Sequence, residues 1–169
     1  MLEYGTGGRY LSIILYNKEM DDKKIKVRVR LIIIKNNKIL LSYTQDEDFY
    51  FYIGGKIEFG ETIKEACIRE VQEECKANFT FKKILYIRDF ILPEIDEHSI
   101  EFFILGEVDK FEEIEGIKDK EFEGKHWQTW VDINKLSEIN IKPKNLTSKI
   151  LESYKNGFTS DTEYVGIIE

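Results

Sequence analysis

The sequence predicts an α/β (α+β) protein, with a mixed sheet and helices packed on its faces. Three observations predict this fold: charged and apolar residues alternate with period two from Ile25 to Leu31, the pattern becomes helical from Thr62 to about Lys76, and further strand-like segments follow that helix. Several strands, one helix in the middle of the chain and a helix near its end favour helical layers against a sheet.

The first part of the chain is expected to form strands joined by short turns. Tyr10 to Asn17 is a candidate first strand. The alternating segment continues through apolar residues to Ile34, turns at Asn36-Asn37 and pairs with Ile39 to Tyr43 as a hairpin. A short aromatic strand from Phe49 to Ile53 follows.

The second part begins with the helix. Thr62, with Glu65 three residues later, is a capping-box pattern, so we expect Thr62 to be the N-cap. The elements expected after it are strands around Phe79 to Ile91 and Ile100 to Val108, an acidic loop from Lys110 to Glu123, a last strand from Trp127 to Val131, a short helix capped by Asp132 or Asn134 and reaching Leu136, and a C-terminal helix from Asn145 to Tyr154.

Length and charge limit the classes of function. The 169 residues are expected to form a single domain, residues 1–169, with a core from about 25 to 155. The net charge of −7 gives no general attraction for a nucleic-acid strand, so we expect no such partner. Binding of a small anionic ligand remains compatible with this net charge, because a bound divalent cation reverses the local charge.

The cysteine content and hydropathy favour a cytoplasmic protein. Cys67 and Cys75 would lie roughly 12 Å apart along one helix, too far for a disulfide within it. They are therefore predicted to be buried, reduced side chains. No apolar run approaches the ~20 residues that a membrane-spanning helix needs, so no membrane partner is expected.

Three glutamates share one surface of the predicted helix. Glu70, Glu73 and Glu74 are spaced i, i+3, i+4, and Glu74 falls within the apolar arc of the helical wheel. Like charges at this spacing destabilise a helix, and hard oxygen ligands suit Mg²⁺ or Mn²⁺. The Gly54-Gly55 pair just before adds backbone carbonyls. The structural alternative is a solvated acidic face.

These residues belong to a longer pattern. The stretch GGKIEFGETIKEACIREVQEECKA, residues 54–77, resembles the Nudix box: Gly55 is its first glycine, Glu61 its first glutamate, and Arg69-Glu70-Val71 with Glu73-Glu74 fills its core in register. One position departs, because Lys76 stands where the pattern has a glycine that resembles a left-handed helix end. We expect either a strained helix end at Lys76 or a helix that ends differently, at Asn78.

The resemblance implies a Nudix-type α/β/α sandwich and a set of site roles. Glu73 and Glu74 would be the principal ligands of Mg²⁺ or Mn²⁺ with the Gly54 carbonyl, and Glu70 would bind a second ion or act as general base. Arg69 would orient Glu70 or Glu73, and Glu61 would link the loop to the helix. Gly55, Lys56 and Glu61 would contact the substrate. A further carboxylate ligand would come from the acidic loop, for which Glu121 and Glu123 are the candidates.

The resemblance implies hydrolysis of the diphosphate linkage of a nucleoside-diphosphate derivative. The alternative is a Nudix-like domain that binds a nucleotide as a sensor without turnover, and intact Arg69, Glu70, Glu73 and Glu74 favour the enzyme. A third reading is an unrelated α/β domain with a solvated acidic helix. The identity of the nucleotide and the formation of a homodimer stay open.

Overall fold

The computed structural model describes residues 24–119 and 124–167. Its strands and α-helices are β1 (Lys26–Lys35), β2 (Lys38–Thr44), β3 (Phe49–Phe51), α2 (Ile63–Cys75), β4 (Phe79–Leu92), β5 (Glu97–Val108), β6 (His126–Asp132), β7 (Ile141–Lys142), α3 (Thr147–Lys155) and β8 (Glu163–Ile167). Short 3₁₀ helices cover Pro93–Ile95, Glu112–Ile114, Ile133–Lys135 and Lys144–Leu146.

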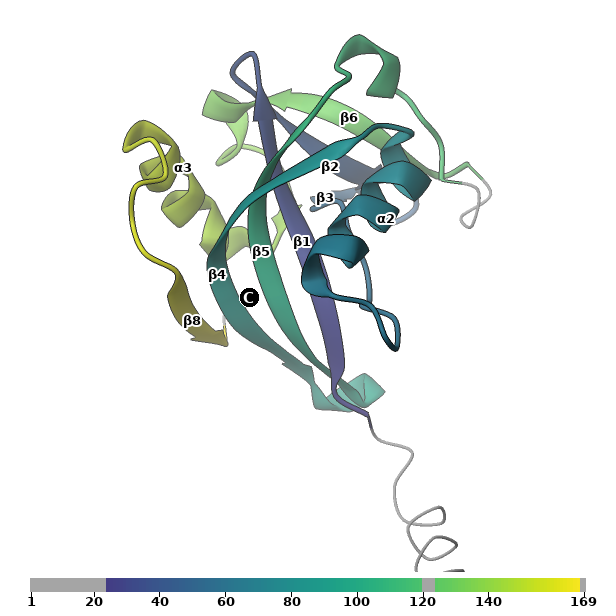
Figure 1. The fold of residues 1–169 in the computed structure, drawn as a ribbon, viewed down its shortest axis with the longest axis vertical. Coiled ribbons are helices and arrows are strands. Elements are labelled where there is room, and N and C mark those ends of the chain that lie inside the picture. Colours follow the sequence, from purple (N-terminus) through teal and green to yellow (C-terminus); the bar gives the residue numbers. More distant parts are fainter. Residues whose placement is uncertain (1–23, 120–123, 168–169) are drawn as a thin grey trace, which may run out of the picture.

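The described strands form a mixed, curled sheet. Its order is β7-β3-β2-β1-β5-β4-β8, and β6 pairs with β2 off this path. The pairs β1–β5, β4–β8 and β3–β7 are parallel, whereas β4–β5 and β2–β6 are antiparallel. In Figure 1, α2 covers one face of the sheet and α3 lies on the other. The predicted fold class, a mixed sheet between helices, is confirmed.

The β1–β2 hairpin sets the position of the segment that follows β3. Asn36 and Asn37 have positive φ angles of 53° and 59°, the conformation that a two-residue hairpin turn needs, and the predicted turn is confirmed. The two strands pair only at their turn ends before β2 leaves β1. Beyond that point, the segment that follows β3 lies along the edge of β1 in place of β2. There the Val29 amide donates to the Gly55 carbonyl at 2.9 Å. The glycine pair therefore lies beside a central strand.

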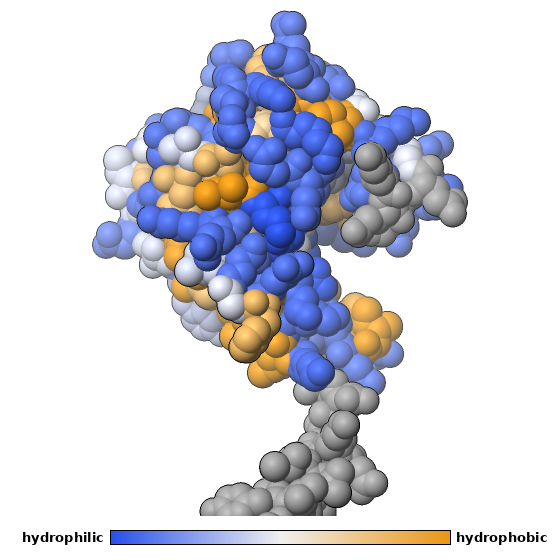
Figure 2. Space-filling view, turned by 45° about the vertical axis from the view of Figure 1, so that its right-hand side comes forward, coloured by the Kyte–Doolittle hydropathy of each residue, from blue (hydrophilic) through white to orange (hydrophobic). Residues whose placement is uncertain are grey.

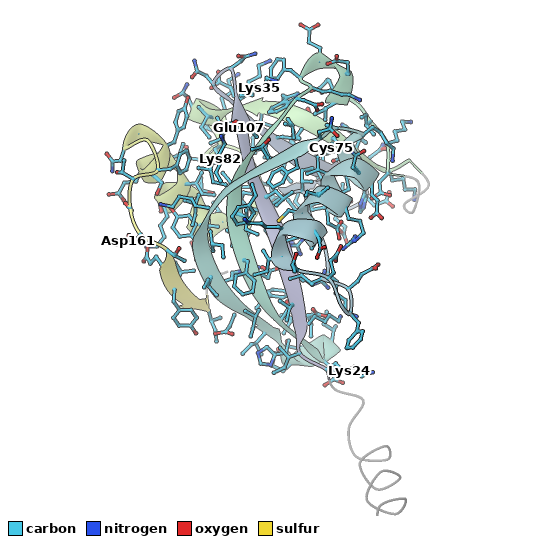
Figure 3. All side chains as sticks on the ribbon, in the orientation of Figure 1. Lys24, Lys35, Cys75, Lys82, Glu107 and Asp161 are labelled. Atoms are coloured by element: carbon cyan, nitrogen blue, oxygen red, sulfur yellow. The ribbon has the colours of Figure 1, made fainter. Side chains whose placement is uncertain are left out.

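Two apolar clusters hold the layers together. Alternate residues of β1, among them Val29 and Leu31, pack against α2 with the buried Cys67 and Cys75. Both cysteines are free, as predicted, and Figure 3 shows Cys75 toward the C-terminal end of α2. The second cluster lies toward α3 and includes Ile150. Each fully buried valine, leucine or isoleucine side chain contributes about 1.5–3 kcal/mol to folding. The first cluster therefore fixes α2 against β1.

Three expectations about the ends of the chain need comment. The prediction that Trp127 to Val131 is the last strand was wrong, because β7 and β8 follow it. β7 has two residues and β8 lies half exposed at the sheet edge, so neither carries a clear apolar period. The short helix is a 3₁₀ turn whose N-cap is Asp132. The candidate strand Tyr10 to Asn17 lies outside the described residues.

Most of the face drawn in Figure 2 is hydrophilic, with separate apolar patches. Several exposed apolar residues belong to the start of β1 and to the β4–β5 connection, namely Ile25, Ile91, Leu92 and Ile95. Within the described ranges, no helix is long and apolar enough to cross a membrane.

Both ends of α2 follow from its sequence. Thr62 is the N-cap, and the capping box with Glu65 is present, as predicted. At the other end Lys76 adopts the left-handed conformation, with φ 53° and ψ 33°. The first of the two expected endings is therefore the observed one, and a lysine occupies a conformation that favours glycine.

Replacing Lys76 with glycine should stabilise the protein. Lys76→Gly should raise the free energy of unfolding by about 0.5–1 kcal/mol, because relief of left-handed strain exceeds the entropy cost of a more flexible unfolded chain. Urea denaturation measures the change. The matched control, Gln72→Gly at an exposed position inside α2, should lose about 1 kcal/mol. Equal destabilisation by both substitutions would show that Lys76 is not strained.

Candidate active site

The Gly54-Gly55 segment approaches its neighbours too closely for side chains. Gly54 has a positive φ of 127°, and a Cβ atom there would lie 2.3 Å from the Val29 carbonyl oxygen. A Cβ atom on Gly55 would lie 2.5 Å from Oε1 of Glu70. Glycine at these two positions lets α2 bring its carboxylates against the backbone of this segment.

The carboxylate of Glu74 lies among three polar groups, although the single hydroxyl proton of Ser42 is shared with Oε1 of Gln128 at 2.6 Å. Its Oε1 accepts from the Gly54 amide at 3.0 Å, and its Oε2 accepts from the Ser42 hydroxyl at 3.2 Å and the Gln128 amide at 3.4 Å. Burial raises the pKa of Glu74 to about 8, although the Gly54 amide acts in the opposite direction. The nearby charge of Glu70 raises it further. A cation beside Glu74 would stabilise the ionised form.

Glu70 lies one helical turn before Glu74 and faces the same backbone. The residue is 8% exposed, and its Oε1 accepts from Nη1 of Arg69 at 2.8 Å. Burial raises its pKa, while Arg69 acts to lower it. A buried carboxylate with a raised pKa is suited to taking up a proton near neutral pH.

Arg69 links the loop to the helix. Its Nε and Nη2 donate to the two carboxylate oxygens of Glu61 at 2.9 and 3.0 Å, and the hydrogen bond holds the pKa of Glu61 below its usual value. Nη2 also donates to the Lys56 carbonyl at 3.0 Å, and Nη1 to Glu73 at 3.1 Å. Arg69 was expected to contact Glu70 or Glu73 and contacts both, and the expected link of Glu61 to the helix is also present.

The acidic residues do not all converge. The Glu73 side chain is 60% exposed and turns toward Arg69. Across residues 24–119 and 124–167, no three Asp, Glu, His or Cys side chains gather closely enough to hold an ion. The Gly54 carbonyl accepts from Nη1 of Arg30 at 3.3 Å. Glu70, which is buried, and Glu74, which is partly buried, nevertheless place carboxylate oxygens beside a backbone carbonyl, the kind of ligands that a hard divalent cation takes.

A cleft of about 1240 Å³ adjoins this surface. Its lining includes all of the site residues predicted within the described chain except Glu61, and Lys56 is exposed at its rim. Aromatic side chains form another part of the wall, namely Phe49, Phe51, Tyr52, Phe59 and Phe90. Glu121 and Glu123 lie outside the described residues, but Asp119, two residues before Glu121, lines the cleft.

Sequence reasoning missed one group of cleft residues. Arg30, Arg88 and Glu101 lie on strands β1, β4 and β5 and line the same cleft as the glutamates of α2. In the sequence, Arg30 serves only as a polar position in a strand alternation. The available signal was that a charged residue on a strand with both faces covered needs a buried partner.

Comparisons with known proteins identify the family of the chain. The NUDIX domain model matches residues 24–154. The chain is 30% identical over 162 residues to an ADP-ribose pyrophosphatase from Methanocaldococcus jannaschii, with 89% of each chain covered. Among solved structures, a NUDIX-family hydrolase from Clostridium perfringens has a TM-score of 0.61 at 22% identity, covering 79% of this chain and 98% of that one.

A MutT protein from Methanosarcina mazei Go1 has a TM-score of 0.62 at 20% identity and covers 83% of this chain and 99% of its own. These two structures are similar in fold, and the family model spans the strand–loop–helix segment that carries Gly54 to Glu74. The chain therefore belongs to the NUDIX domain family.

Proposed function

We propose that this protein is a divalent-metal-dependent hydrolase that cleaves the diphosphate linkage of a nucleoside-diphosphate derivative. The observation that carries the proposal is the placement of Glu70 and Glu74 against the Gly54-Gly55 backbone, in the wall of a large cleft. One buried and one partly buried carboxyl group placed side by side cost stability when both are ionised, so the arrangement favours a function that needs them.

The residues divide the chemical work among them. Glu74, Glu73 and the Gly54 carbonyl are the proposed ligands of Mg²⁺ or Mn²⁺. A bound divalent cation offsets the charge of the diphosphate and acidifies water. Glu70 accepts the proton of the attacking water, and Arg69 holds Glu70 in place by a charge-assisted hydrogen bond. Lys56, at the rim, offers its ammonium to a phosphate.

ADP-ribose is the first substrate to test. The relative from Methanocaldococcus jannaschii is named as an ADP-ribose pyrophosphatase, and this chain covers 89% of it. Phe49 and Phe51 line the cleft with their ring centroids 5.9 Å apart, so this wall has aromatic side chains, the kind of surface against which a nucleobase packs. Intact Arg69, Glu70, Glu73 and Glu74 favour turnover over a binding-only role.

Replacing Glu74 should remove activity without unfolding the protein. The parent should hydrolyse ADP-ribose only when Mg²⁺ or Mn²⁺ is present, and Glu74→Gln should lower kcat by about 100-fold or more. In a chelator its melting temperature should not fall, because glutamine has nearly the shape of glutamate and carries no ionisable group that burial disfavours. Product analysis by chromatography measures the rate, with Glu152→Gln on the exposed face of α3 as the control. A fully active Glu74→Gln enzyme would refute the ligand assignment.

The close approach at Gly55 gives a second test. Gly55→Ala should destabilise the fold by about 1–3 kcal/mol and lower kcat, because the new methyl group overlaps the Glu70 carboxylate. The double variant Gly55→Ala/Glu70→Ala should recover the stability and remain inactive. Denaturant titration and initial rates measure both properties. If the double variant is no more stable than Gly55→Ala, the overlap is not with Glu70.

A further inference from the structure

The sheet side of the cleft carries a buried group of arginines around one carboxylate. Glu101 of β5 is 2% exposed, and Arg88 of β4 is 6% exposed. Nε of Arg30 donates to Oε1 of Glu101 at 3.0 Å, and Nε of Arg88 donates to Oε2 at 2.6 Å. In the strand register Glu101 lies directly opposite Arg88 on one side and Arg28 on the other. Three neighbouring strands thus place these charges on one face.

Stability does not explain why these charged side chains are buried together. Taking paired charges out of water costs about as much as their attraction returns, and apolar side chains of similar volume are often as stabilising. Burial acts to raise the pKa of Glu101, but Arg30 and Arg88 outweigh it and hold the pKa below its usual value. Glu101 is therefore an anion that orients two guanidiniums beside the cleft.

The arginines adjoin the proposed catalytic surface. The Gly54 carbonyl accepts from Nη1 of Arg30 at 3.3 Å, while the Gly54 amide donates to Glu74 at 3.0 Å. The peptide groups of Gly54 therefore lie between the Arg30 guanidinium and the Glu74 carboxylate. Among the described cleft-lining residues of β1, β4 and β5, three are arginines, at 28, 30 and 88, and one, Glu101, is acidic. This side of the cleft favours an anion.

We propose that Arg30 and Arg88 bind phosphate oxygens of the substrate, on the part of the cleft wall that β1, β4 and β5 form. This inference rests on the proposed function, because it assigns the second anchor of the same diphosphate. Planar guanidiniums match phosphate oxygens in geometry and remain charged. The Arg88 guanidinium also stacks over Phe90 and Phe103, at 5.0 and 5.8 Å from the ring centroids, which limits its motion before the ligand binds.

Metal-free binding of inorganic pyrophosphate tests the proposal. Calorimetry in a chelator at fixed ionic strength should show binding by the parent. Arg88→Gln/Glu101→Gln, which removes both partners of the Arg88–Glu101 ion pair together, should raise Kd about ten-fold or more, the loss expected for hydrogen bonds to a charged group. Arg88→Lys keeps Glu101 paired and should raise Kd about three-fold or more, because an ammonium lacks the fork. If the double variant does not fold, the Kd of Arg88→Lys still tests the phosphate-binding role of Arg88.

Lys82→Gln is the matched control. Lys82 is also on β4, but it pairs with Glu107 at 3.0 Å outside the cleft, and both residues are labelled in Figure 3. Its Kd should stay within about two-fold of the parent, since distant exposed charges are screened. Parent-like binding by the arginine variants, or no binding by the parent, would overturn the phosphate role. If pyrophosphate binding depends on Arg88 but the protein hydrolyses no nucleotide, the phosphate-binding role of Arg88 is supported and only the hydrolase proposal is contradicted.

Discussion

The hydrogen bond from the Gly54 amide to the Glu74 carboxylate is the interaction on which the arrangement of the site depends. It joins the helix to a segment that has taken the edge of β1 after β2 leaves it. The segment fits only because Gly54 and Gly55 lack side chains, and α2 stays in place because its apolar residues pack on β1. The position of the Gly54 amide therefore depends on the sheet topology, on the two glycines and on the packing of α2.

The same arrangement works against stability. Glu74 is ionisable yet partly buried, and Glu70, 8% exposed, lies one helical turn away, so the two carboxylates repel each other when both are ionised. Arg69 offsets part of this repulsion by contacting Glu70, Glu73 and Glu61 together. The apolar clusters on both faces of the sheet supply the stability that such a surface requires. Charge is thus concentrated at the cleft and compensated by packing elsewhere.

The strongest local patterns were predictable from the sequence, whereas contacts between distant strands were not. The capping box at Thr62 and the Asn36-Asn37 turn depend on neighbouring residues, and both are as expected. The outward turn of Glu73 and the contacts of Arg69 depend on how the loop folds back. The Arg30–Glu101 pair joins residues 71 positions apart, through a parallel register that no local period encodes. β8 was missed because an exposed edge strand lacks a buried face.

The central claim is that α2 and the Gly54 backbone hold a divalent cation between them. The most direct measurement is an anomalous difference map from crystals soaked in Mn²⁺ without nucleotide. The account predicts a peak within about 2.5 Å of a Glu74 carboxylate oxygen and of the Gly54 carbonyl oxygen. A map with no peak at this position, or with Mn²⁺ held only by residues away from the cleft, would contradict it.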